Sequence, residues 1–257
     1  MKNDGEGTRI SLLTIANNKE IMQDFRENLA SQIGVDYELL ACDNFGNHIS
    51  SAREALNHLA EKAVGDYLVF LHPDIRFLDP YSLHDLIEKC RLLEDSGVIG
   101  VAGSPEKIEN GDRIILSSIF HGEDKKPAGI SISEPTEVQT VDECLFIVRR
   151  TLFLKTGFSE LIGFHMYAVE LCLDMILNGY KNYVVPADVW HMSDGKSLSP
   201  DYVKCAKIIV HKYKNNFKNI NTTVKRWKTE GAGAELYLDF YFLKQIIKKK
   251  IRRKTER

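Results

Sequence analysis

The chain has no run that approaches the ~20 apolar residues of a membrane-spanning helix. Residues 1–9 are polar and contain no apolar core of a secretory signal. The five cysteines are widely spaced, odd in number and free of any CxxC pair, which argues against a disulfide framework and a structural zinc site. We therefore expect a cytoplasmic protein with reduced thiols and a flexible segment at residues 1–9.

A glycine-rich phosphate loop is also missing after the first predicted strand. The chain there reads Ala16–Asn17–Asn18–Lys19–Glu20, with no Gly and no Arg. This disfavours a nucleotidyltransferase, which usually carries such a loop with Arg and Lys. Gly97, Gly100 and Gly103 lie within and around a later strand, so the sequence also lacks a nicotinamide-binding GxGxxG fingerprint after its first strand.

The formal net charge is only −2, which gives no signal for a nucleic-acid partner. The charge is uneven, however, because residues 244–257 hold eight Lys or Arg and one acidic residue. Apolar residues from Leu236 to Ile247 precede this basic tail. Such a helix can lie on an anionic surface, so we expect peripheral contact with the inner face of a membrane. A solvated helix end and an oligomer contact are the alternatives.

Apolar runs and amphipathic segments alternate over the first hundred residues. Strands are predicted at 10–16, 37–42, 67–71 and 98–102, and helices at 20–32, 50–64 and 80–94, the last capped by Asp79 with Pro80 at its first position. This alternation predicts an α/β fold with a doubly wound, mostly parallel central sheet. Ligands of such sheets bind beyond the carboxyl ends of the strands. The segments to examine are therefore Asn17, Asp43–Asn44 and His72–Pro73–Asp74.

The pattern breaks at residues 104–137, which are polar and contain Gly and Pro. We predict loops and hairpins there, typical of a lid or a specificity region. Regular structure is predicted to resume at 138–148. A helix at 167–177 follows, then a strand at 182–185 that leads through Pro186 to residues 189–191, and helices near 199–213 and 234–253.

Several short motifs carry a family resemblance through their order and spacing. They are Asp43–Asn44, Asn57, Phe70–Ile75 (FLHPDI), Val141–Asp142, Arg149–Arg150, Thr156–Phe158, Phe164–Glu170, Gly179–Tyr180 and His191–Gly195. With these motifs the chain resembles GT-A glycosyltransferases of the family 2 type, in particular a bacterial glycosyltransferase-like branch. The resemblance runs from about Ile10 to Gly195. It implies a GT-A, Rossmann-like nucleotide-sugar-binding domain at 10–197, followed by a helical extension with a basic tail at 198–257.

The resemblance also implies a divalent metal at the diphosphate of the donor. Family members hold it with a short acidic motif after a strand, and here that motif reads His72–Pro73–Asp74. His191 matches a downstream histidine of the family, so Asp74 and His191 are the expected metal ligands. One carboxylate with imidazoles suits Mn²⁺ somewhat better than Mg²⁺. A metal-independent enzyme is the alternative, with Asp74 as a turn cap and His191 as a satisfied buried histidine.

Donor recognition is expected from polar residues near the strand ends. The predicted donor-binding residues are Asn17, Asp43, Asn44, Arg53, Asn57, His72, Asp74 and Ser193. By the resemblance, Asp43 would recognise the nucleobase or the ribose, and Asn17 and Arg53 the uracil or the diphosphate. Turn formation at Asp43 and ordinary loop or surface roles at Asn17 and Arg53 are the alternatives.

The general base is the point where the sequence departs from the family. An inverting transfer needs a carboxylate to deprotonate the acceptor hydroxyl. The usual first acidic position corresponds to Ala168 and the second to Glu170. We therefore predict Glu170 as the general base, with Asp142 as the second catalytic candidate. A helix N-terminal charge favoured by the macrodipole is the alternative for Glu170.

Together these features predict a hexosyl- or deoxyhexosyl-transferase of polysaccharide biosynthesis. It would move a sugar from a UDP-, GDP- or dTDP-sugar to a hydroxyl of a glycan, a lipid-linked saccharide or a glycoprotein, with inversion. A non-catalytic nucleotide-sugar-binding protein is the main alternative, because His72 and Ala168 depart from the family pattern. A nucleotidyltransferase is the weaker one.

Overall fold

A computed structural model describes the chain over residues 8–193 and 199–255. Residues 1–7 lie outside these ranges, and with them most of the segment predicted to be flexible. Asp194 and Gly195, at the end of the last family motif, also lie outside the described residues.

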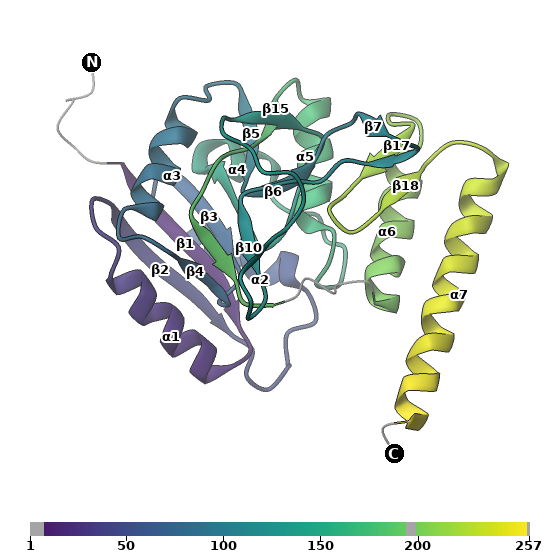
Figure 1. Cartoon of the computed structure of the whole chain (residues 1–257), viewed down its shortest axis with the longest axis horizontal. Helices are drawn as coiled ribbons and strands as arrows, with labels where there is room; N and C mark the ends of the chain where they lie inside the picture. Colours follow the sequence, from purple (N-terminus) through teal and green to yellow (C-terminus); the bar gives the residue numbers. More distant parts are fainter. Residues whose placement is uncertain (1–7, 194–198, 256–257) are drawn as a thin grey trace.

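A seven-stranded sheet forms the centre of the molecule (Figure 1). In spatial order its strands are β12 (Thr136–Val138), β15 (Lys181–Val184), β5 (Ser96–Gly100), β14 (Leu145–Arg149), β3 (Tyr67–Leu71), β1 (Arg9–Ala16) and β2 (Asp36–Asp43). Strand β14 runs antiparallel to both of its neighbours, and β12 is antiparallel to β15. The other five strands share one direction. The prediction of a mostly parallel sheet is therefore confirmed, and the sheet is mixed because β12 and β14 run the other way.

Helices cover both faces of this sheet, which explains why its central strands are apolar throughout. One face packs against α1 (Lys19–Ala30) and α3 (Ser82–Arg91). The other face packs against α2 (Ala52–Lys62), α4 (Arg150–Thr156) and α5 (Tyr167–Leu177). Successive side chains of a strand point to opposite faces. In β14, accordingly, Leu145 and Ile147 belong to the first core and Phe146 and Val148 to the second.

Local sequence signals set most of the helix starts. Asn18 and Ser51 accept the backbone N–H groups of Ile21 and Glu54 and so cap α1 and α2. The predicted start of α3 is wrong by two residues, because the carboxylate of Asp79 accepts the Tyr81 N–H in a turn before the helix. The short helix α4 was not predicted; its seven residues are too few for a clear helical period.

Residues 104–137 form short strands and loops, as predicted. Two small sheets lie beside the central one, in the orders β11–β10–β16–β4 and β13–β6–β9. Their strands are β4 (Ile75–Phe77), β6 (Ala102–Ser104), β9 (Leu116–Ser117), β10 (Ile119–His121), β11 (Lys126–Pro127), β13 (Thr140–Val141) and β16 (Val189–His191). A separate hairpin joins β7 (Ile108–Glu109) to β8 (Asp112–Arg113).

The C-terminal part packs against α5 through a third apolar cluster. This C-terminal part contains α6 (Pro200–Tyr213), the hairpin of β17 (Asn219–Asn221) and β18 (Arg226–Lys228), and α7 (Ala232–Thr255). Figure 1 shows α7 beside α6 at the edge of the molecule far from α1. No helix within the described ranges combines the length and the apolar character needed to cross a bilayer.

Candidate metal and sugar-nucleotide site

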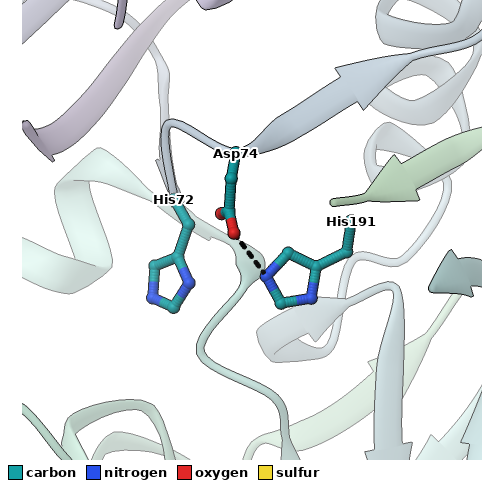
Figure 2. Close-up of side chains that lie close together, drawn as sticks. All are labelled: His72, Asp74 and His191. Carbon is teal, nitrogen blue, oxygen red and sulfur yellow. Dashed lines mark ion pairs between the residues drawn. The ribbon is translucent and has the colours of Figure 1, made fainter. Parts of the chain in front are cut away.

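The site is built around the tight connection between β3 and β4. His72, Pro73 and Asp74 form this connection, and the His72 carbonyl accepts the Ile75 N–H at 3.2 Å. Strand β16 pairs antiparallel with β4 and sets His191 opposite Ile75. The Met192 N–H then donates to the Asp74 carbonyl at 3.0 Å. The sheet register therefore brings His191 to His72 and Asp74, which lie more than a hundred residues before it in the sequence (Figure 2).

The three side chains point toward a common centre. One ligand atom from each of His72, Asp74 and His191 lies within 4.8 Å of the others. His191 Nε2 is 3.3 Å from Asp74 Oδ2 and 3.0 Å from Ser193 Oγ. His191 Nδ1 is buried and makes no hydrogen bond within the described part of the chain. Two imidazoles and one carboxylate at this spacing fit a divalent metal after a small inward movement.

The protonation of these groups favours cation binding. Burial lowers the pKa of His72 below its ordinary value, so its ring is neutral near pH 7. Burial alone would raise the pKa of Asp74, but the hydrogen bond from His191 and the nearby His191 and His72 outweigh it and lower that pKa. A metal needs deprotonated carboxylate and imidazole ligands, and the lowered pKa values of Asp74 and His72 favour these forms.

Two cavities meet at this group. The first, of about 360 Å³, is lined at the strand ends by Asn17, Asn44, His72 and Asp74, with Tyr167 behind them. The second, of about 340 Å³, is lined by apolar and polar residues. Its polar lining residues include His72, His121, Asp142, Glu143, His165, His191, Tyr202 and Thr223. His72 and Phe164 line both cavities, so the two cavities are adjacent at these residues.

The structure brings four of the predicted donor-binding residues to the first cavity: Asn17, Asn44, His72 and Asp74. Asp43 lies next to them at the end of β2, exposed, with its carboxylate accepting the Phe45 N–H at 2.7 Å. Asn44 is buried and accepts the Ile49 N–H through its side chain. Ser193 is exposed and reaches the site through its hydrogen bond with His191.

Arg53 and Asn57 are placed differently. Arg53 is fully buried, and its Nε and Nη2 atoms each lie 3.1 Å from Glu170 Oε2. Asn57 uses its amide to bind both the N–H and the carbonyl of Phe158, each at 2.9 Å. Neither residue is among the described residues that line the two cavities. In this structure both hold the segment before α5 rather than face a ligand.

Glu170 also lies away from the cavities. It is 4 % exposed, in the first turn of α5, and is surrounded by donors. Besides Arg53, Ser159 Oγ donates to its Oε2 at 2.7 Å and Lys212 Nζ donates to its Oε1 at 2.8 Å. Both oxygens of this carboxylate thus already accept from neighbouring side chains, and Glu170 is not among the described residues that line the two cavities.

Asp142 lines the second cavity, as does its neighbour Glu143, which sequence reasoning missed. Asp142 accepts the Thr223 hydroxyl and the Cys144 N–H, and these bonds lower its pKa despite burial. Burial, with Asp142 beside it, raises the pKa of Glu143 to about 8. The only signal for Glu143 was a second charge next to Asp142 in an otherwise apolar segment.

Solved structures of other proteins share this arrangement of strands and helices. The chain superposes on the S. aureus TarS fragment 1–349 in complex with UDP-GlcNAc with a TM-score of 0.54 and 14% identity, covering 93% of this chain and 71% of TarS. The mannosyltransferase PcManGT from Pyrobaculum calidifontis, in complex with GDP-Man and Mn²⁺, gives a TM-score of 0.53 at 10% identity over 93% of this chain and 70% of PcManGT. At these identities the likeness shows a shared fold, and it confirms the GT-A prediction.

Comparison with known sequences adds a relative and a family to this shared fold. A protein of Fuscovulum blasticum described as "ATP synthase subunits region ORF 6" is 25% identical over 189 residues, which is 70% of this chain and 72% of that protein. The model of the family described as "Glycosyltransferase like family" matches residues 11–213, from β1 to the end of α6. The chain therefore belongs to this glycosyltransferase-like family.

Proposed function

We propose that the protein transfers a sugar from a nucleoside-diphosphate sugar to a hydroxyl acceptor, with inversion at the anomeric carbon. The observation that carries this proposal is the meeting of two cavities at the His72–Asp74–His191 group. A transfer between two bound molecules needs such a junction, because the reacting atoms must lie within about 3.5 Å of each other. TarS and PcManGT share the fold and were solved with UDP-GlcNAc and GDP-Man, respectively.

The first cavity suits the donor. It lies beyond the carboxyl ends of β1, β2 and β3, where ligands of α/β sheets bind. Asn17 and Asn44 offer amide groups to the nucleoside, and Asp43 lies exposed beside them. Asp74 and His191, with His72, would hold a Mn²⁺ or Mg²⁺ ion, which offsets the charge that builds on the departing diphosphate.

The second cavity suits the acceptor. Its wall carries Asp142, His165, Tyr202 and Thr223, groups that can exchange hydrogen bonds with hydroxyls. We assign Asp142 to binding, because Thr223 and the Cys144 N–H hold its carboxylate in one orientation. The segment at 104–137 supplies Ile115, Ser117, His121 and Gly129 to the same wall, so it contributes to the choice of acceptor.

The exposed side of α7 supports a membrane-bound acceptor, such as a lipid-linked saccharide. Leu236, Phe240, Leu243 and Ile247 are 72, 66, 55 and 48% exposed. At about 100° per residue they form one stripe, opposite the side that packs against α6. The chain then continues into the Lys- and Arg-rich residues 248–254. An apolar stripe that runs into a basic segment fits the cytoplasmic face of an anionic lipid membrane.

Sedimentation with vesicles tests this contact. We expect the protein to bind vesicles with 30 % phosphatidylserine and not pure phosphatidylcholine, and the Phe240→Ser/Leu243→Ser variant to lose at least 10-fold in affinity, on the order expected for two buried apolar side chains. Equal binding of both proteins, or a dimer broken by the same substitutions in analytical ultracentrifugation, would contradict the membrane assignment.

Binding of UDP, GDP, dTDP and CDP, measured by calorimetry with and without Mn²⁺, tests the donor site. We expect one diphosphate to bind in a Mn²⁺-dependent manner, and Asp74→Ala to weaken that binding at least 10-fold by removing a metal ligand. Asp43→Ala is the matched control for the metal, since Asp43 lies outside the group, and its binding should keep its Mn²⁺ dependence. Binding that ignores both the metal and the Asp74 substitution would remove the metal site. No binding of any diphosphate would overturn the proposed function.

A further inference from the structure

The link between β13 and β14 places a glutamate at the start of α5. Glu143 lies in this link, and its Oε1 accepts the Tyr167 N–H at 2.6 Å. The Ala168 N–H also points to this carboxylate. The first N–H groups of a helix lack partners within the helix and carry partial positive charge, so a carboxylate is held firmly there.

Glu143 remains accessible from the second cavity. Its side chain is partly exposed and lies on the same wall as His72, Asp142 and His191. His72 marks the junction with the first cavity, so the wall that carries Glu143 extends to the place where donor and acceptor meet. The carboxylate is therefore fixed in position while its surface faces the cavity.

The three acidic groups Glu170, Asp142 and Glu143 differ in how their oxygens are occupied. Glu170 is enclosed by Arg53, Lys212 and Ser159. Asp142 is stabilised as an anion by its hydrogen bonds, which weakens it as a base. Glu143 makes no ion pair with any residue of the described ranges, and burial makes its anion the strongest base of the two carboxylates that line this cavity.

We propose that Glu143 is the general base of the transfer, a role that rests on the proposed glycosyltransferase function. Its carboxylate takes the proton of the acceptor hydroxyl while the hydroxyl oxygen forms a bond to the anomeric carbon. The bond from that carbon to the diphosphate oxygen breaks, and the nucleoside diphosphate leaves with the bonding electrons. The proton stays on Glu143 and passes to water after the products leave. Glu143 thereby supplies, from another segment, the carboxylate that Ala168 cannot.

Glu143→Gln tests the proposal, because glutamine keeps an oxygen for the Tyr167 N–H but cannot accept the proton. The assay uses the donor whose nucleotide binds, with octyl glucoside as the acceptor and water as the background acceptor. We expect kcat to fall by about 10²–10⁴-fold. The Kd of the nucleoside diphosphate should change less than threefold. Asp142→Asn is the matched comparison, and we expect it to raise the KM of the acceptor more than it lowers kcat.

A second variant guards against a purely structural effect. Glu143→Asp keeps a carboxylate but shortens its reach, so a base role predicts more activity for Asp than for Gln. A helix-capping role alone predicts the reverse. The proposal is overturned, with the proposed function intact, if the wild-type protein transfers sugar and Glu143→Gln keeps kcat within threefold. If the wild-type protein transfers no sugar from any donor to octyl glucoside or to water, the base role of Glu143 and the proposed function are both overturned.

Discussion

Two glutamates meet the first turn of α5, and their surroundings are opposite. Glu170 belongs to the helix itself and is held by Arg53, Ser159 and Lys212. Glu143 comes from a neighbouring link, binds the backbone N–H of Tyr167 and lines a cavity, and it forms no ion pair within the described part of the chain. A paired carboxylate of this kind contributes to folding, whereas an unpaired one that faces a cavity is available for chemistry.

The start of α5 therefore takes part both in folding, through Glu170, and in the candidate site, through Glu143. Arg53 ties α2 to the segment before α5, because its Nη1 also donates to the His165 carbonyl at 3.1 Å. This holds the helix whose first N–H groups orient Glu143. The Arg53–Glu170 ion pair therefore helps to hold the helix start that orients Glu143. Substitutions at Arg53, Glu143, Ser159 and Lys212 separate the two roles.

Arg53→Met should cause the largest loss of stability. Methionine keeps most of the side-chain volume but leaves the buried Glu170 with Ser159 and the part-exposed Lys212, so we expect a loss of about 3–5 kcal/mol in the free energy of unfolding. Urea unfolding followed by circular dichroism measures it. The Arg53→Met/Glu170→Leu double variant should regain at least half of that loss, since no unpaired charge remains. A double variant that is less stable than the single one would contradict the ion-pair account.

Glu143→Gln should change stability in a pH-dependent way. The carboxyl has its ordinary pKa of 4.5 in the unfolded chain and a pKa of about 8 in the folded one, raised by burial and by Asp142 and lowered in part by Arg53. The folded state therefore binds an extra proton between these values, and stability falls as the pH rises from about 5 to 8. Glutamine removes this cost, so the variant should be more stable than the wild type at pH 8, by on the order of 1–3 kcal/mol.

The comparison is made by urea unfolding at pH 5, 6.5 and 8 in the presence of a chelator. Other groups that titrate in this range are common to both proteins and cancel in the difference. We expect the two proteins to agree at pH 5 and to diverge steadily toward pH 8. A constant difference across the range would mean that Glu143 titrates normally in the folded protein.

Ser159→Ala should have a moderate effect. Its hydroxyl donates to Glu170 Oε2 at 2.7 Å, and a hydrogen bond to a charged partner contributes about 1.5–3 kcal/mol. We expect a loss near the lower end, because Arg53 continues to neutralise the same oxygen. Thermal and urea unfolding measure the change, and the kcat of the transfer should stay within threefold. If kcat falls by more than threefold while the free energy of unfolding changes little, Glu170 acts in catalysis.

Lys212→Met should have the smallest effect. The lysine side chain is 43% exposed, so water can replace much of its interaction with Glu170 and Asp174. Ion pairs at this exposure contribute less than about 1 kcal/mol. Urea unfolding at low and high salt checks the value, and the difference from wild type should shrink with salt. A loss equal to that of Arg53→Met would show that both cations are needed to hold Glu170.

The element order was predictable from the sequence because buried strands and helices show a local pattern of apolar residues. Strand β3 (Tyr67–Leu71) and helix α5 (Tyr167–Leu177) have the bounds predicted from apolar periodicity. Short elements such as β4 and α4 were missed, since their few residues do not complete a recognisable period. The antiparallel placement of β14 inside the sheet also has no local signal, because a strand buried on both faces looks the same in either direction.

The sequence by itself determined the α/β class and, through the family motifs, pointed to Asp74 and His191. Only the tertiary structure decided how the acidic groups around α5 divide their roles. Arg53 and Glu170 are 117 positions apart, and Glu143 and Tyr167 are 24 apart. The chemistry of each carboxylate depends on which distant donor or cavity the fold sets beside it. A contact of that kind is a property of packing between elements, and it leaves no period or spacing in the chain.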